Sequence, residues 1–283
     1  MHYREHHPKA PLNRYVECFW ILESETLPDS PTTERILPDG CVELILNFGA
    51  RFLRHTETKQ SLQPLNFLVG QMTGPVFISP TGTVRLLGLR FHPGGTVPFF
   101  SVPIQELTDQ IVELGSLASR FESELMAVGS DLKSMDERIA AIETLLISYV
   151  LRIKTEPSAI LLARKIVDCG GIVSVDQLAN ETGISARQLE RRFLSEVGIG
   201  PKLLSRIVRF QQVFRAVEKC DGAWAPVAVE CGYYDQAHLI RDFNQFAQQT
   251  PAVLFAEQSE LTHAFTRKDR TSDFSNTAIE RFS

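Results

Sequence analysis

The chain has 283 residues, of which 43% are hydrophobic and 22% are charged, and its formal net charge is −5 at pH 7. This is the composition of an ordinary globular protein with room for two domains. No apolar run approaches the roughly 18 residues of a membrane span. The first residues lack the apolar core of a signal peptide, so we expect a cytoplasmic protein with no membrane partner.

Residues 3–100 predict a β-rich unit. Runs of aromatic and β-branched residues at 15–22 and 41–48 lie on either side of a Pro38-Asp39-Gly40 turn. Further strands are expected at 67–69, 76–78 and 84–91, the last ended by His92-Pro93-Gly94-Gly95. Short strands at this spacing are typical of a small barrel or sandwich.

Helical periodicity begins near Pro103. The apolar residues between Ile104 and Leu114 predict one helix, and those from Ile139 to Ile153 predict a longer one with a broad apolar stripe. Two interpretations of that stripe stay open: it packs against its own barrel, or it forms a dimer contact through Ile142 and Leu146.

A repeated unit follows. The first copy has Ala179, Gly183, Leu189, Phe193 and Pro201, and the second has Ala228, Gly232, Leu239, Phe243 and Pro251. The shared Ala and Gly lie 49 residues apart, and the shared Leu, Phe and Pro lie 50 apart. A repeat at nearly fixed spacing indicates two copies of one supersecondary unit.

Each copy predicts a helix-turn-helix. In the first copy, capping boxes at Ser174–Gln177 and Ser185–Gln188 open two short helices, and Gly183 supplies the turn between them. Such a motif places its second helix in a DNA major groove. The alternative is an ordinary pair of helical hairpins, which two copies in register make less attractive. Gly200-Pro201 opens a long helix that connects the copies.

These patterns divide the chain into a β-rich domain with C-terminal helices (1–153), a linker (154–158), a DNA-binding domain (159–258) and a polar tail expected to be disordered (266–283). The two helix-turn-helix motifs are expected at 174–194 and 226–244. The predicted fold class is a two-domain chain, with an N-terminal α+β part (a cupin-like β-barrel or sandwich followed by helices) and a C-terminal all-α double helix-turn-helix joined by the long helix.

Charge argues against DNA binding at first sight. Residues 158–257 hold eleven Lys and Arg against eleven Asp and Glu. DNA responds to a local face rather than to the sum, however, and the stretch 201–219 carries five basic residues against one acidic residue.

The motifs resemble the AraC/XylS family of bacterial transcription regulators over about residues 158–257. The resemblance lies in Ala179 to Gly183, 189–193, 198–201, Ala228 to Tyr233 and 238–251. It departs at Gln248, where family members usually have Gly. The segment 35–45 is similar to the sensor barrel of the family, which implies a sensor or dimerisation role for the domain 1–153. The two spaced His and the Glu of metal-binding cupins are missing, since His55 and His92 stand alone.

The helical geometry and the resemblance agree on which residues face DNA. Leu189 and Phe193 point inward on one recognition helix, as do Leu239 and Phe243 on the other. The expected base contacts are Arg187, Glu190, Arg191, Gln236, Ala237, His238 and Arg241. The expected phosphate contacts are Ser185, Lys202, Arg206 and Arg209. For each single residue the alternative is a solvated surface side chain.

The implied function is sequence-specific DNA binding by a transcription regulator whose two recognition helices read successive major-groove segments. Double-stranded DNA is the expected partner, with RNA polymerase, an unidentified small-molecule effector and a second copy of the chain as further candidates. Polar residues on apolar strands, Glu43, Asn47, Arg90 and His92, are candidates for the effector site, although mutual pairing with no ligand explains them better.

The sequence predicts no catalytic residue, no cofactor and no metal site. The five cysteines are scattered and fit reduced structural thiols. A methyl-accepting repair enzyme needs a cysteine cluster, which the N-terminal half lacks. The remaining rival is a ligand-binding protein whose helical half binds another protein instead of DNA.

Overall fold

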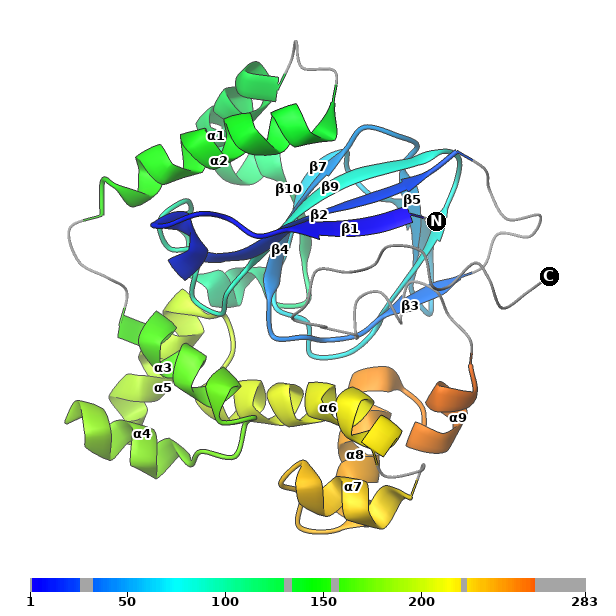
Figure 1. The fold of residues 1–283 in the computed structure, drawn as a ribbon, viewed down its shortest axis with the longest axis vertical. Helices are drawn as coiled ribbons and strands as arrows, with labels where there is room; N and C mark the ends of the chain where they lie inside the picture. The colour runs from blue at the N-terminus through cyan, green and yellow to red at the C-terminus, as the bar shows by residue number, and fades with distance from the viewer. Residues whose placement is uncertain (1, 26–32, 130–133, 154–157, 220–222, 258–283) are drawn as a thin grey trace.

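The structure is a computed structural model that describes residues 2–25, 33–129, 134–153, 158–219 and 223–257. Its N-terminal part contains two antiparallel sheets. The larger has the order β1–β2–β9–β4–β7–β10, with bounds His2–His6, Val16–Ser24, Val84–Phe91, Val42–Asn47, Asn66–Val69 and Ile111–Glu113. The smaller has the order β3–β8–β5–β6, with bounds Glu34–Ile36, Val76–Pro80, Phe52–His55 and Gln60–Leu62. The expected barrel or sandwich is thereby confirmed (Figure 1).

Side-chain alternation gives the larger sheet two apolar faces. On β2, Phe19 and Ile21 belong to a core shared with helices, whereas Trp20 and Leu22 belong to a second core. β4 and β9 alternate in the same way, so Glu43 and Arg90 lie on the face that looks toward the smaller sheet. The larger sheet is therefore the middle layer of a helix–sheet–sheet sandwich.

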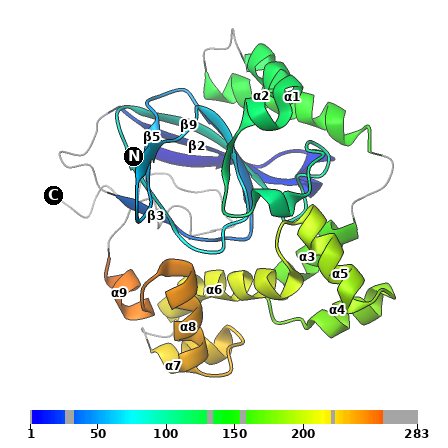
Figure 2. The ribbon, with the colours of Figure 1, turned by 180° about the vertical axis from the view of Figure 1, so that it is seen from behind.

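The helix layer consists of α1 (Leu114–Gly129), α2 (Met135–Val150) and the short 3₁₀ helix η1 (Leu12–Arg14). Figure 2 shows α1 and α2 together on the outer face of this sheet. Ile142 and Leu146 are 1% and 0% exposed within this core. Packing of the stripe against its own domain is thus confirmed, and a dimer contact through these two residues is wrong because their side chains are already buried.

The expected helix between Ile104 and Leu114 is also wrong. Ile104–Leu107 forms a 3₁₀ helix, η2, and Ile111–Glu113 forms β10, which pairs with β7. The α-helix starts only at Leu114. Pairing with an available sheet edge outweighed the helical spacing of the apolar residues.

The C-terminal part is all α-helical in the residues described. The helices are α3 (Ser158–Asp168), α4 (Val175–Thr182), α5 (Ala186–Glu196), α6 (Pro201–Lys219), α7 (Trp224–Glu230), α8 (Gln236–Ala247) and α9 (Pro251–Ala256). Their shared core runs along α6 and includes a cluster of Phe210, Phe214, Phe243, Phe246 and Phe255. The predicted linker at 154–158, except Ser158, and the predicted tail at 266–283 lie outside the described residues.

Candidate DNA-reading surface and sensor cavity

The first helix-turn-helix is formed by α4 and α5. Ser174 caps α4 and Ser185 caps α5, and both make the predicted capping boxes with Gln177 and Gln188. Gly183 ends α4 at φ +66°, a left-handed conformation that glycine adopts without the steric cost of a Cβ atom. The predicted caps and turn are therefore confirmed.

The α5 helix separates a buried side from an exposed side. Leu189 and Phe193 are both 0% exposed, so they anchor the helix in the core. Arg187, Glu190 and Arg191 are exposed on the outer side. The next arginine, Arg192, is half-buried and donates to Ser158 Oγ over 3.4 Å, so it faces α3 instead.

The second unit is formed by α7 and α8. Asp235 caps α8 by accepting a hydrogen bond from the His238 backbone N–H over 2.7 Å. Leu239 and Phe243 are 0% exposed. The candidate base-reading residues Gln236, Ala237 and Arg241 are exposed.

His238 is more constrained than the other candidates on α8. It is half-buried, and its ring meets the ring of Tyr233 edge-on, with centroids 5.2 Å apart. Arg241 Nε donates to the Ala237 carbonyl over 3.2 Å, which holds that side chain back along the helix. The side chains of His238 and Arg241 are therefore both held in place by contacts within the domain.

The four candidate phosphate contacts differ in their surroundings. Ser185 and Lys202 are exposed. Arg206 forms an ion pair of 2.7 Å with the buried Asp242, and its guanidinium lies over the ring of Phe246. Arg209 donates to the Gly171 carbonyl over 3.0 Å. Arg206 and Arg209 thus fasten α6 to its neighbours, a role that the sequence alone did not reveal.

The α6 helix separates the two units. Figure 1 shows α4 and α5 at one end of α6 and α7 and α8 at the other. With 19 residues, the helix is about 28 Å long, because each residue adds roughly 1.5 Å. That length is close to the roughly 34 Å between successive major grooves on one side of a duplex.

A cavity lies between the two sheets. It contains about 850 Å³ of space that atoms leave free, part of it open to solvent. Its wall is mostly apolar, from residues such as Leu22, Ile45, Phe52, Phe67 and Leu86. A concave apolar site with a few polar groups is the usual form of a small-molecule site.

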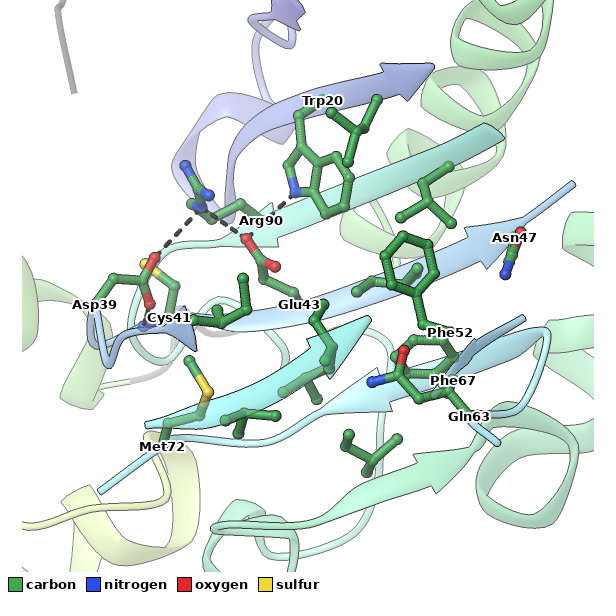
Figure 3. Close-up of a pocket in the computed structure, with 18 of the residues that line it drawn as sticks. Trp20, Asp39, Cys41, Glu43, Asn47, Phe52, Gln63, Phe67, Met72 and Arg90 are labelled. Atoms are coloured by element: carbon green, nitrogen blue, oxygen red, sulfur yellow. Dashed lines mark hydrogen bonds and ion pairs between the residues drawn. The ribbon is translucent and has the colours of Figure 1, made fainter. Parts of the chain in front are cut away.

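Polar groups gather at one end of the cavity (Figure 3). Glu43 Oε1 accepts hydrogen bonds from Arg90 Nε over 2.8 Å and from Trp20 Nε1 over 3.2 Å. Asp39 lies 3.4 Å from Arg90 Nε. Burial raises the pKa of Glu43, and the neighbouring Arg90 guanidinium opposes that rise. The mutual pairing expected for Glu43 and Arg90 is present.

The sequence-predicted effector residues do not all reach this cavity. Glu43, Asn47 and Arg90 line it, but His92 is not among the lining residues. Asn47 uses its side chain locally, since it donates to the Ala50 carbonyl and accepts from the Gly49 N–H. Sequence reasoning missed Trp20 and Asp39. Strand alternation on β2 could have indicated Trp20, and the Pro-Asp-Gly turn could have indicated Asp39.

The segment from Leu37 to Cys41 connects the cavity with α6. Leu37, Asp39 and Cys41 line the cavity, and Leu37 also belongs to the helical core. The Pro38 carbonyl accepts a hydrogen bond from Gln211 on α6 over 2.6 Å. A Cβ atom at Gly40 would lie 2.9 Å from Leu204 of α6, so the backbone approaches the helix closely. Leu37, Asp39 and Cys41 of this segment thus face the cavity, whereas Pro38 and Gly40 face α6.

In the part of the chain that the structure describes, no group of three or more His, Cys, Asp or Glu side chains is placed to hold a metal ion. No helix within the described ranges is long and apolar enough to cross a membrane.

Comparisons with known proteins identify both parts. Residues 178–257 match a family described as a helix-turn-helix domain, and residues 4–113 match a domain of unknown function, DUF6597. No curated protein matches the chain.

Similar solved structures include ToxT from Vibrio cholerae at 1.65 Å resolution, with 8% identity, a TM-score of 0.47, and coverage of 92% of this chain and 100% of ToxT. The same protein with bound unsaturated fatty acid gives 9% identity, a TM-score of 0.42, and coverage of 83% and 92%. The AraC-like transcriptional activator CuxR gives 16% identity, a TM-score of 0.26, and coverage of 73% and 74%.

The helical part of the chain is a helix-turn-helix domain, with α4–α5 and α7–α8 as its two units. The chain therefore joins a β-rich N-terminal domain to a C-terminal helix-turn-helix domain.

Proposed function

We propose that one molecule reads two successive major-groove segments of a duplex, with α5 and α8 as its recognition helices. The observation that carries this proposal is the pair of exposed polar faces, each backed by a Leu and a Phe that are 0% exposed. Their separation along α6 suits one turn of DNA. One molecule then reads a site that need not be palindromic.

The proposed base contacts follow from hydrogen-bonding geometry. Arg187 and Arg191 are suited to the O6 and N7 atoms of guanine, and Glu190 accepts from the N4 amino group of cytosine. On α8, Gln236 and His238 offer further polar contacts, Ala237 lies flat against the groove, and Arg241 reaches a base edge. Ser185 and Lys202 are the better phosphate contacts, because Arg206 and Arg209 already have protein partners.

The cavity gives the same molecule a means of regulation. A small effector that fills it touches Leu37, Asp39 and Cys41, while Pro38 and Gly40 of the same segment pack on α6. Effector and DNA then both bias the position of one segment, which is the requirement for coupling between two sites. The family of the helical domain supports this role, and we propose that the protein acts by binding and not by catalysis.

The remaining partners follow from this role. We propose that the protein acts in the cytoplasm, with RNA polymerase and a second copy of the chain as its protein partners. A dimer would use a surface other than Ile142 and Leu146, because those side chains are buried in their own domain.

Selection of random duplexes by the full chain tests the proposal. We expect enrichment of a site with two blocks about ten base pairs apart. Binding to that site should weaken steeply with salt, since each neutralised phosphate lowers the logarithmic slope by roughly 0.9.

Arg192→Ala is the matched control for Arg191→Ala. Both changes remove one positive charge from α5, but Arg192 faces Ser158. We expect the control to keep the selected sequence. If no sequence is enriched and binding stays weak at every salt concentration, DNA reading is excluded and the helical half is a protein-interaction module.

A further inference from the structure

The cavity between the sheets has two polar ends and an apolar middle. Asp39, Glu43 and Arg90 form one end, and Figure 3 shows Gln63 at the other, beside Phe52 and Phe67. Between them the wall is apolar. A ligand that fills this space is elongated, with an apolar body.

The first end holds more acidic than basic side chains. Asp39 and Glu43 line it together with one guanidinium, that of Arg90. Arg90 is 2% exposed and already lies within 3.5 Å of Glu43, Asp39 and Glu5, so its guanidinium is occupied. A ligand carboxylate would therefore meet an excess of negative charge and a cation that is already paired.

Glu43 retains an unused acceptor. Its Oε1 receives both hydrogen bonds, from Arg90 and from Trp20, and Oε2 has no partner among the residues that the structure describes. The position is well held, because the Trp20 ring lies against Gly88, where a Cβ atom would be only 1.9 Å from the indole. Oε2 is thus a fixed acceptor at a cavity wall, suited to a hydrogen-bond donor.

Gln63 supplies the second, independent observation. It is 8% exposed and lines the cavity, and its side-chain amide makes no hydrogen bond within the described part of the chain. The amide is therefore available at the cavity wall to a polar group of a ligand. The far end of the cavity therefore also fits a polar atom.

We propose that the effector is an organic cation: a protonated amine on an aromatic or aliphatic body, with its ammonium group at Glu43 Oε2. This assignment rests on the proposed role of the cavity as an effector site, and it specifies the ligand class. A hydroxyl or carbonyl on the distal part of the ligand would reach Gln63.

Three probes with one body and different end groups test the charge preference. Phenylbutylamine, phenylbutanol and phenylbutyric acid are titrated into the full chain by calorimetry, without DNA. The amine should bind about tenfold or more tightly than the alcohol, since a hydrogen bond to a charged group is the stronger kind. The acid should bind weakest. If the acid binds as tightly as the amine, or if none of the three binds, the proposal is overturned.

Two variants locate the binding. Glu43→Gln should remove the preference for the amine over the alcohol. Ile45→Phe fills the apolar middle, leaves the charged end intact, and should weaken all three probes together. If Glu43→Gln fails to fold, the ranking of the three probes on the parent protein and the Ile45→Phe result still test the proposal. Amine binding that survives Ile45→Phe unchanged would place the ligand elsewhere and refute the assignment.

This test is separate from that of DNA reading. The titration uses no DNA, so a failure of the amine leaves duplex selection unaffected. A failure of duplex selection likewise leaves the ranking of the three probes standing.

Discussion

Arg90→Met removes the cation at the centre of the buried polar cluster. The Arg90 side chain is 2% exposed and lies 2.8, 3.4 and 3.5 Å from carboxylate oxygens of Glu43, Asp39 and Glu5. Each attraction is worth about 5 kcal/mol at an effective dielectric constant of 20. The cost of burying the guanidinium cancels much of this, and loss of one partner from a buried pair costs about 3–5 kcal/mol. Because the carboxylates are partly exposed, we expect Arg90→Met to lower the free energy of unfolding by about 3 kcal/mol.

The deficit in stability of Arg90→Met relative to the parent protein should depend on pH in a defined direction. Burial already raises the pKa of Glu43, and removal of Arg90 takes away the group that opposes this rise. A carboxyl whose pKa is higher in the folded than in the unfolded state destabilises the fold when ionised. The loss should therefore be full at pH 7 and should shrink as the pH falls toward about 4.3, the value of an unfolded Glu.

Urea unfolding at pH 7 and pH 5 measures both effects. Trp20 reports on the β-rich domain when Trp224→Phe removes the second tryptophan from the background. Arg85→Met is the control on the same strand, where the side chain is 49% exposed and its ion pair with Glu23 should contribute less than about 1 kcal/mol. The reasoning is refuted if Arg90→Met matches the parent at pH 7, or if its deficit grows on acidification.

Two further changes test the helical domain, with Trp224 fluorescence in urea as the readout. Gln248 ends α8 at φ +54°, a left-handed conformation that is unfavourable for a residue with a Cβ atom, so Gln248→Gly should stabilise by roughly 0.5–1 kcal/mol. Ala252→Gly, in α9, should instead destabilise by about 1 kcal/mol, and equal signs would contradict this account. Phe243→Ala removes a ring that is 0% exposed and lies 4.8 Å from the Phe210 ring. It should cost about 3–5 kcal/mol, and a loss below about 1 kcal/mol would show that the aromatic cluster does not hold α8.

The features that the sequence predicted correctly depend on short-range patterns. Capping boxes at Ser174 and Ser185 involve residues three positions apart, and the repeat compares two complete units. Strand alternation likewise placed Glu43 and Arg90 as polar residues on apolar strands. Such patterns need no knowledge of distant contacts.

The features that were missed depend on distant contacts. Residues 111–113 form a strand because β7 offers an edge for them to pair with. The strand β6 was missed because it is short and exposed. Without β6, nothing in the sequence indicated that Gln63 would face a cavity. The roles of Arg206 and Arg209 likewise need Asp242 and Gly171, which lie 36 and 38 residues away.

Gln248, at the end of α8, is a further case in which the sequence alone did not settle the local backbone conformation. The sequence departs at this position from the family that it resembles, and α8 nevertheless ends in a left-handed conformation without glycine.

The central claim is that α5 and α8 of one molecule each read a separate part of one DNA site. Duplex selection repeated with Arg191→Ala and with Arg241→Ala tests it most directly. The account predicts that Arg191→Ala relaxes the base preference in one block and Arg241→Ala in the other, with about 1–3 kcal/mol lost at each affected position. Loss of both blocks together in either variant, or of neither block in both, would contradict it.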